Sequence, residues 1–269
     1  MGIVTRTPSS ASGRPGLIVL NAGVIHRVGP HRMNVALARR SADAGFPAMR
    51  YDLGGLGDSR AQQRHGADPT FRERAVADTR AAMDCLERAE GVREFVLFGL
   101  CSGADNGLAT ALADRRVVGL VLVDPYTWVT PQARVRKLRS KVEGRSPREI
   151  AAWGVSTGLR KARGLLSELK GRASAEAPAQ QGRTSPAPEE FGGWLHQLLD
   201  RRVSILAVYS GSLGERYNDE DQLFETFPDL RGRVDHAWFP EANHTFTSRQ
   251  AQRRLIDTTT AWLTRRFAG

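Results

Sequence analysis

Short apolar runs alternate along the chain with segments whose apolar residues recur at helical spacing. We expect strands at 16–20, 48–51, 95–98, 117–123, 203–209 and 234–239. Helices are expected over 31–44, 71–89, 102–113, 219–224 and 248–267. An unbroken apolar run such as 117–123 is typical of a strand that is covered on both faces of a parallel sheet. The pattern therefore predicts an α/β protein with about six mostly parallel strands and helices on both faces.

The alternation is interrupted between residues 126 and 200. These residues carry helical signals but no strand pattern, so we predict a helical insertion, with one helix opening at Pro147 and another spanning 165–169. The stretch 171–190 is rich in Ala, Gly, Ser and Pro and is expected to be a mobile loop. The core is then formed by 16–125 and 201–269, and residues 1–15 are expected to be a flexible N-terminus.

The charge balance changes the picture of the insertion. The 269 residues include 39 Lys and Arg against 29 Asp and Glu, a net charge of +10, and 41% are hydrophobic, which is an ordinary globular composition. Residues 126–172 hold 12 basic and 3 acidic residues, so this segment alone carries 12 − 3 = +9. It could attract the phosphates of coenzyme A, an acidic acyl-carrier protein or an anionic membrane surface. A solvated outer face is the alternative, whereas nucleic acid is disfavoured because no recognised binding module accompanies the charge.

Candidate chemistry begins at Cys101. An apolar strand runs into Gly99-Leu100-Cys101-Ser102-Gly103 and then into a helical segment. A nucleophile on such a sharp turn needs small residues two positions to either side, because neighbouring backbone passes close by. The strand, the turn and the helix together predict a nucleophile elbow, with Cys101 as the nucleophile.

With this elbow the sequence resembles the α/β-hydrolase family, in the cysteine variant found in its dienelactone-hydrolase branch. Three further segments resemble parts of that family. Residues 17–24 resemble its oxyanion turn, although Ala22 replaces the usual histidine, and residues 52–59 resemble its Asp-x-x-Gly-x-Gly-x-Ser turn. Residues 239–246 resemble the loop that bears its catalytic histidine, which is His244 here. The resemblance implies that the insertion 126–200 is a helical cap. It also implies that the sheet begins at the family's third strand.

The resemblance implies an acyl-transfer enzyme, which could be a hydrolase, thioesterase or acyltransferase, with a thioester intermediate on Cys101. His244 would be the base, and the backbone N–H groups of Val24 and Ser102 would hold the oxyanion. In family order the acid follows the strand 203–209, which makes Glu215 the first choice and leaves Asp219 or Asp124 as alternatives. A non-hydrolytic binding protein and a lyase remain the alternative functions.

Several other residues could contact the substrate, which we expect to be a small-molecule ester or thioester. His26, with Arg27, His31 and Arg32 beside it, could contact an anionic group or lie in a solvated loop, and Trp128 and Trp153 could line an acyl pocket or pack the cap core. No motif for a cofactor or metal ion is present, and we expect neither. We expect a cytoplasmic protein, because the sequence has only two cysteines and lacks an N-terminal signal-peptide core. We expect no membrane span, because the sequence contains no long apolar run.

Overall fold

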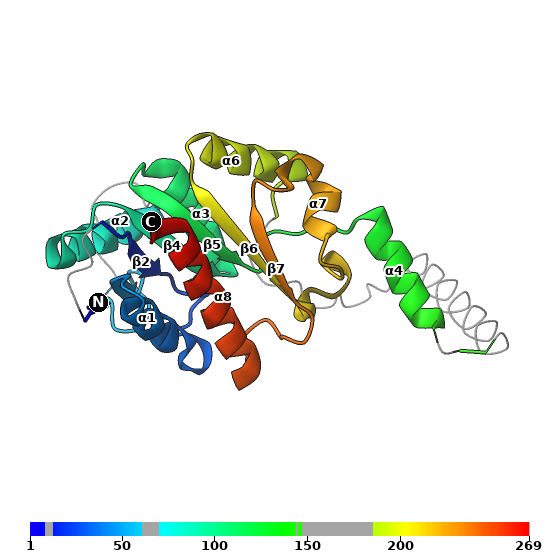
Figure 1. The fold of residues 1–269 in the computed structure, drawn as a ribbon, viewed down its shortest axis with the longest axis horizontal. Helices are drawn as coiled ribbons and strands as arrows, with labels where there is room; N and C mark the ends of the chain where they lie inside the picture. Colours follow the sequence, from blue (N-terminus) through cyan, green and yellow to red (C-terminus); the bar gives the residue numbers. More distant parts are fainter. Residues whose placement is uncertain (9–12, 61–69, 144, 147–184, 269) are drawn as a thin grey trace, which may run out of the picture.

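The protein is described here by a computed structural model that places residues 1–8, 13–60, 70–143, 145–146 and 185–268. Its centre is a seven-stranded sheet in the order β1-β3-β2-β4-β5-β6-β7 (Figure 1). The strands are β1 Gly2–Thr5, β2 Gly16–Val19, β3 Ala48–Tyr51, β4 Phe95–Leu100, β5 Val117–Val123, β6 Ser204–Ser210 and β7 Asp235–Phe239. Only β1 pairs antiparallel, with β3, so the predicted mostly parallel sheet is confirmed.

Helices cover both faces of this sheet, as the alternation predicts. Helices α1 (Met33–Asp43) and α8 (Arg249–Phe267) bury Leu37 and Trp262 on one face. Helices α2 (Phe71–Glu90), α3 (Ser102–Ala113) and α6 (Pro188–Asp200) bury Met83, Leu108 and Leu195 on the other. The central strands β4 and β5 are almost fully buried because both faces are covered, and this explains their unbroken apolar sequences.

The N-terminus differs from the expected flexible segment. Residues Gly2–Thr5 form the edge strand β1, with Ile3 opposite Arg50 and Val4 opposite Met49, and the N–H of Asp52 donates to the Met1 carbonyl at 2.9 Å. The sheet therefore has seven strands where about six were expected, and residues 2–5 of the expected flexible N-terminus 1–15 form one of them. A half-buried four-residue edge strand carries too few apolar positions to stand out from a loop.

The predicted insertion contains helices and no strand among its described residues. Helix α4 (Pro131–Val142) begins at the N-cap Thr130, whose hydroxyl accepts from the N–H of Ala133 at 3.0 Å, and it projects away from the sheet (Figure 1). Helix α6 instead packs against α3, so this part of 126–200 belongs to the layer that covers the sheet. The helices predicted from Pro147 and over 165–169 lie outside the described residues, as does 171–184 of the predicted loop, whose last residues, 188–190, are helical.

Candidate active site

Cys101 lies between the last residue of β4 and the first residue of α3, at the carboxyl edge of the sheet. Its backbone has φ 56° and ψ −119°, a combination that costs an L-residue conformational energy and is typical of functional positions. A Cβ at Gly99 would overlap the backbone carbonyl of Gly103, and a Cβ at Gly103 would lie 2.5 Å from the carbonyl oxygen of Asn21. Both glycines are therefore required by close backbone approach, as the predicted turn demands.

His244 lies in the loop between β7 and α8. The loop is closed by its own hydrogen bonds, because the N–H of Phe246 donates to the carbonyl of Asn243 and the N–H of Thr247 to its side-chain oxygen, each at 2.9 Å. The buried ring of Phe246 packs edge-on against Phe239, with 5.8 Å between the ring centroids. These contacts fix the loop on the carboxyl edge of the sheet, where His244 hydrogen-bonds to Cys101.

The other partner of His244 is Asp124, the residue that follows β5. The His244 Nδ1 and the Asp124 Oδ2 are 2.7 Å apart. Asp124 is fully buried, and its carboxylate also accepts from the N–H and the hydroxyl of Ser210, each at 2.7 Å. A buried carboxylate with three hydrogen bonds is compensated for its lost hydration.

The pKa of His244 is raised from 6.5 to about 9 by these two neighbours. The hydrogen bond with Asp124 contributes most and the hydrogen bond with Cys101 comes next, while partial burial of the ring acts in the opposite direction. The negative charge of Asp124 adds to the shift. The site therefore favours an imidazolium beside the sulfur, an arrangement that stabilises a thiolate.

Glu215, the first choice from the sequence, does not contact His244 among the contacts that the structure describes. It lies in the short 3-10 segment η2 (Gly211–Arg216) after β6, and its half-exposed side chain forms an ion pair with Lys137 of α4. Asp219 lies 3.7 Å from Arg136. The η2 segment turns Glu215 toward α4, so the structure places Asp124 beside the histidine in the position expected for Glu215.

The two predicted oxyanion donors lie at the start of α3 and in the turn after β2. Ser102 is the first residue of α3, and N–H groups in the first turn of a helix have no partner within the helix. Val24 is 82% exposed at the tip of a turn that the N–H of Ile25 closes by donating to the Ala22 carbonyl at 3.0 Å. The N–H of Gly23 donates to the Ser102 hydroxyl at 2.7 Å, so the two segments are in direct contact.

The basic cluster after this turn is largely engaged in ion pairs. Arg27 is buried, pairs closely with Asp52 and lies 2.7 Å from Asp58, while His26 lies 3.3 Å from Asp58. Hydrogen bonds from Arg27 and Asp58 keep the pKa of Asp52 low although burial acts to raise it. His26, Asp52 and Asp58 have the spacing of a metal-ligand set, but the Arg27 guanidinium already forms ion pairs with both carboxylates. His31 lies beside the histidine loop instead, 3.2 Å from the hydroxyl of Thr247.

The predicted pocket residues have different surroundings. Trp128 packs in an aromatic cluster with Phe191 and Phe227, at centroid distances of 5.4 and 5.7 Å, and its ring N–H donates to the Pro186 carbonyl at 3.3 Å. This environment is one of core packing beside the sheet. Trp153 lies outside the described residues.

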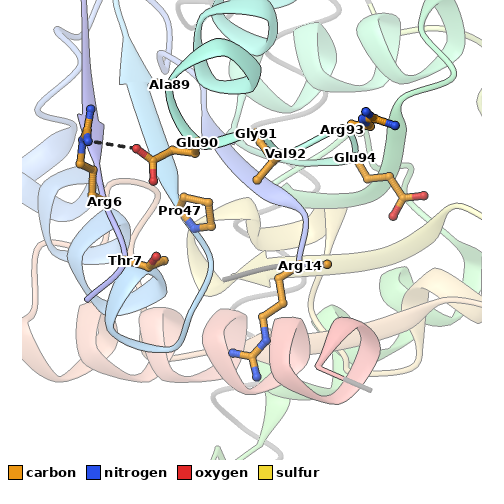
Figure 2. A pocket seen from close by; sticks show the side chains of 11 residues that line it. Arg6, Thr7, Arg14, Pro47, Ala89, Glu90, Gly91, Val92, Arg93 and Glu94 are labelled. Carbon is orange, nitrogen blue, oxygen red and sulfur yellow. Dashed lines mark ion pairs between the residues drawn. The ribbon is translucent and has the colours of Figure 1, made fainter. Parts of the chain in front are cut away.

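Two cavities lie at opposite edges of the sheet. One of about 470 Å³ lies between α4 and the segments that follow β6 and β7, with Lys137, Gly211 and Pro240 in its wall. Another of about 750 Å³ lies at the amino ends of the strands, where Figure 2 shows Arg6 and Glu90 pointing toward one another. The second is far along the strands from Cys101, so the chemistry of the elbow does not reach it.

Ser210 is a site residue that the sequence reading did not single out. Its backbone N–H and its hydroxyl both donate to Asp124, and its oxygen also lies 2.7 Å from the hydroxyl of Ser212. The sequence feature that could have indicated Ser210 is its position at the end of a predicted strand. Ser210 is the last residue of β6 and therefore lies at the same edge of the sheet as Asp124, which follows β5.

A mostly parallel sheet with helices on both faces, a strained residue between a strand and a helix and a later histidine loop is typical of the α/β-hydrolase fold. The chain has this fold. Similar solved structures include the esterase domain of a Rhodothermus marinus protein, which is 16% identical with a TM-score of 0.54 over 99% of this chain and 92% of that one.

Two other solved structures are similar to the same extent. Proline iminopeptidase of Mycobacterium smegmatis is 17% identical with a TM-score of 0.53, covering 98% of this chain and 94% of its own. An α/β serine hydrolase homologue from Coxiella burnetii is 14% identical with a TM-score of 0.52, covering 98% and 89%. At these identities the likeness concerns the fold. No family model matches the chain, and no curated protein matches it either. None of the described helices is both long and apolar enough to cross a membrane.

Proposed function

We propose that the protein is an acyl-transfer enzyme of the cysteine variant of this fold, in which Cys101, His244 and Asp124 form the catalytic triad. The observation that carries the proposal is the chain of contacts from a strained Cys101 through His244 to a fully buried Asp124. Nucleophile, base and orienting acid in hydrogen-bond reach of one another are the arrangement that acyl transfer requires.

The reaction then proceeds in two steps. The Cys101 thiolate attacks the carbonyl carbon of an ester or thioester, and the N–H groups of Val24 and Ser102 stabilise the oxyanion. As the oxyanion collapses, the His244 imidazolium gives its proton to the leaving oxygen or sulfur, which leaves a thioester on Cys101. The neutral imidazole next takes a proton from water, an alcohol or an amine, which attacks the thioester and releases the acyl product and the thiolate.

The acyl donor in this proposal is a small ester or a thioester on coenzyme A or on an acyl-carrier protein. The support is the basic surface of α4, on which Arg134 and Arg139 are exposed and have no ion-pair partner among the residues that the structure describes. Phosphates and acidic carrier surfaces are attracted to such a cluster. We also propose a reducing, cytoplasmic location, which agrees with two free cysteines, Cys85 and Cys101.

Intact mass spectrometry after incubation with a series of activated esters and thioesters tests the triad directly. The wild type should gain one acyl group, Cys101→Ala none, and Cys85→Ser, the matched control in α2, as much as the wild type. Iodoacetamide should label Cys101 before Cys85, because a paired thiolate reacts faster than a thiol. Equal turnover by Cys101→Ala would overturn covalent catalysis. Turnover without an adduct would instead favour the lyase. Absence of both turnover and an adduct would favour the binding protein.

A further inference from the structure

One hydrogen bond joins the two segments that carry the proposed oxyanion donors. The N–H of Gly23, in the turn after β2, donates to the hydroxyl of Ser102 at 2.7 Å. Gly23 and Ser102 are 79 residues apart in the sequence. Ser102 therefore brings a backbone N–H at the start of α3 and, through its side chain, a fixed contact to the turn that contains Val24.

The turn is well anchored at its base and open at its tip. At the base, the Asn21 side chain donates to the Ile25 carbonyl at 2.8 Å and to Asp52 at 3.2 Å, and the N–H of Ile25 closes the turn on Ala22. At the tip, Gly23 has φ +54°, and a Cβ there would meet no atom within 4 Å. The Ser102 hydroxyl is the described contact that ties this tip to the elbow.

The spacing of the two donors matters because an oxyanion is stabilised only by N–H groups placed 2.7 to 3.1 Å from the position that it occupies in the transition state. We propose that Ser102 is a positioning residue whose hydroxyl holds the Gly23-Val24 tip, and with it the Val24 N–H, at the distance from the Ser102 N–H that the oxyanion needs. This inference rests on the proposed function. It assigns a role to the side chain of Ser102, a residue of which only the backbone N–H was expected to act.

Two reactions of the same sulfur separate this role from a general structural one. Acylation of Cys101 by a p-nitrophenyl ester passes through an oxyanion, whereas alkylation by iodoacetamide displaces iodide from a saturated carbon and forms none. A loosened oxyanion turn should therefore slow acylation and leave alkylation unchanged. A displaced Cys101 or a destabilised fold should slow both.

We expect Ser102→Ala to lower the acylation kcat at least about tenfold with KM within about twofold, a loss smaller than the roughly 10²–10³ for a deleted oxyanion donor. Ser102→Thr keeps the hydroxyl and should restore most of the rate. Ser204→Ala, at the far end of β6, is the matched control and should behave as the wild type. Iodoacetamide alkylation should stay within about twofold of the wild-type rate in all three variants.

The outcomes distinguish this inference from the proposed function. If the wild type forms no acyl-enzyme, the proposed function fails and the inference fails with it. If the wild type is acylated and Ser102→Ala is acylated equally fast, only the role of Ser102 is overturned. Equal losses of acylation and alkylation, or failure of Ser102→Thr to recover the rate, would also overturn it, since both would indicate a structural effect on the elbow.

Discussion

Replacing Asp124 by Asn should move the alkaline limit of activity toward neutral pH. In the wild type the pKa of His244 is about 9 against an ordinary value of 6.5, a rise of about 9 − 6.5 = 2.5 units, with the Asp124 hydrogen bond as the largest cause. Asn has nearly the same shape and also tolerates the left-handed backbone that Asp124 adopts at φ 49°. It removes the negative charge and offers an amide N–H where the carboxylate accepted a hydrogen bond.

The magnitude follows from which causes remain. Burial of the ring, which lowers the pKa, is unchanged in the variant, and the Cys101 contact, which raises it, also stays. Loss of an adjacent opposite charge lowers the pKa of a histidine by about 1 to 3 units. If the whole rise is lost, the imidazolium fraction at pH 8 falls from about 90% to about 3%. The raised pKa also stabilises the fold below pH 6.5, and this contribution is lost as the pH rises through about 9.

The assay is the pH profile of kcat/KM with an activated ester, paired with NMR titration of the His244 ring as a readout independent of turnover. The wild type should lose activity with an apparent pKa near 9, the Asp124→Asn variant at least about one unit lower, and Glu215→Gln, the matched control, near 9 again. The reasoning would be refuted if the apparent pKa of the alkaline loss of activity stayed near 9 in Asp124→Asn and moved in Glu215→Gln. The acid role would then return to Glu215.

Two further predictions concern stability and can be measured by urea denaturation. Gly103→Ala would place a Cβ 2.5 Å from the Asn21 carbonyl oxygen and should lower the free energy of unfolding by about 1–3 kcal/mol. Gly193→Ala, in open space on α6, should raise it by about 0.5–1 kcal/mol. Equal effects of the two substitutions would contradict the close-approach argument. Arg27→Gln leaves the buried charge of Asp52 without its ion pair and should lower the free energy of unfolding by about 3–5 kcal/mol at pH 7. This loss should shrink as Asp52 is protonated in acid. A loss that is independent of pH would argue against a role for the ion pair.

The strands that could be predicted best are those whose environment is simplest. The spans 48–51 and 117–123 coincide with β3 and β5. Nearly complete burial selects an unbroken apolar run in β5, and β3 departs from that pattern only at the half-buried Arg50. Strand β1 could not be found in this way, since none of its four residues is buried and it is held by its pairing with β3. The elbow was found because close backbone packing leaves glycine as the acceptable residue at positions 99 and 103.

The sequence ranks Glu215 ahead of Asp124 as the acid, whereas the structure brings Asp124 to His244, and the physical reason for this difference is side-chain direction. The sequence after β6 offers Glu215 in the expected order, but order along the chain does not fix which way a short helical segment turns its side chains. In the structure η2 directs Glu215 to Lys137, and the same strand end contributes Ser210, which supports Asp124. A role that depends on a tertiary contact between two loops cannot be recovered from either loop alone.

The register of the sheet nonetheless makes Asp124 the natural partner of this site. Leu100 and Val123 are paired residues of adjacent parallel strands, so Cys101 and Asp124 are each the first residue beyond the same edge. The N–H of Cys101 donates to the Val123 carbonyl at 2.9 Å, and both Cys101 and Asp124 leave their strands with positive φ. Two chemically reactive residues that directly follow neighbouring parallel strands must lie close together, whatever the loops do. In this chain the sheet itself, more than the order of residues along the sequence, selects the carboxylate that reaches His244.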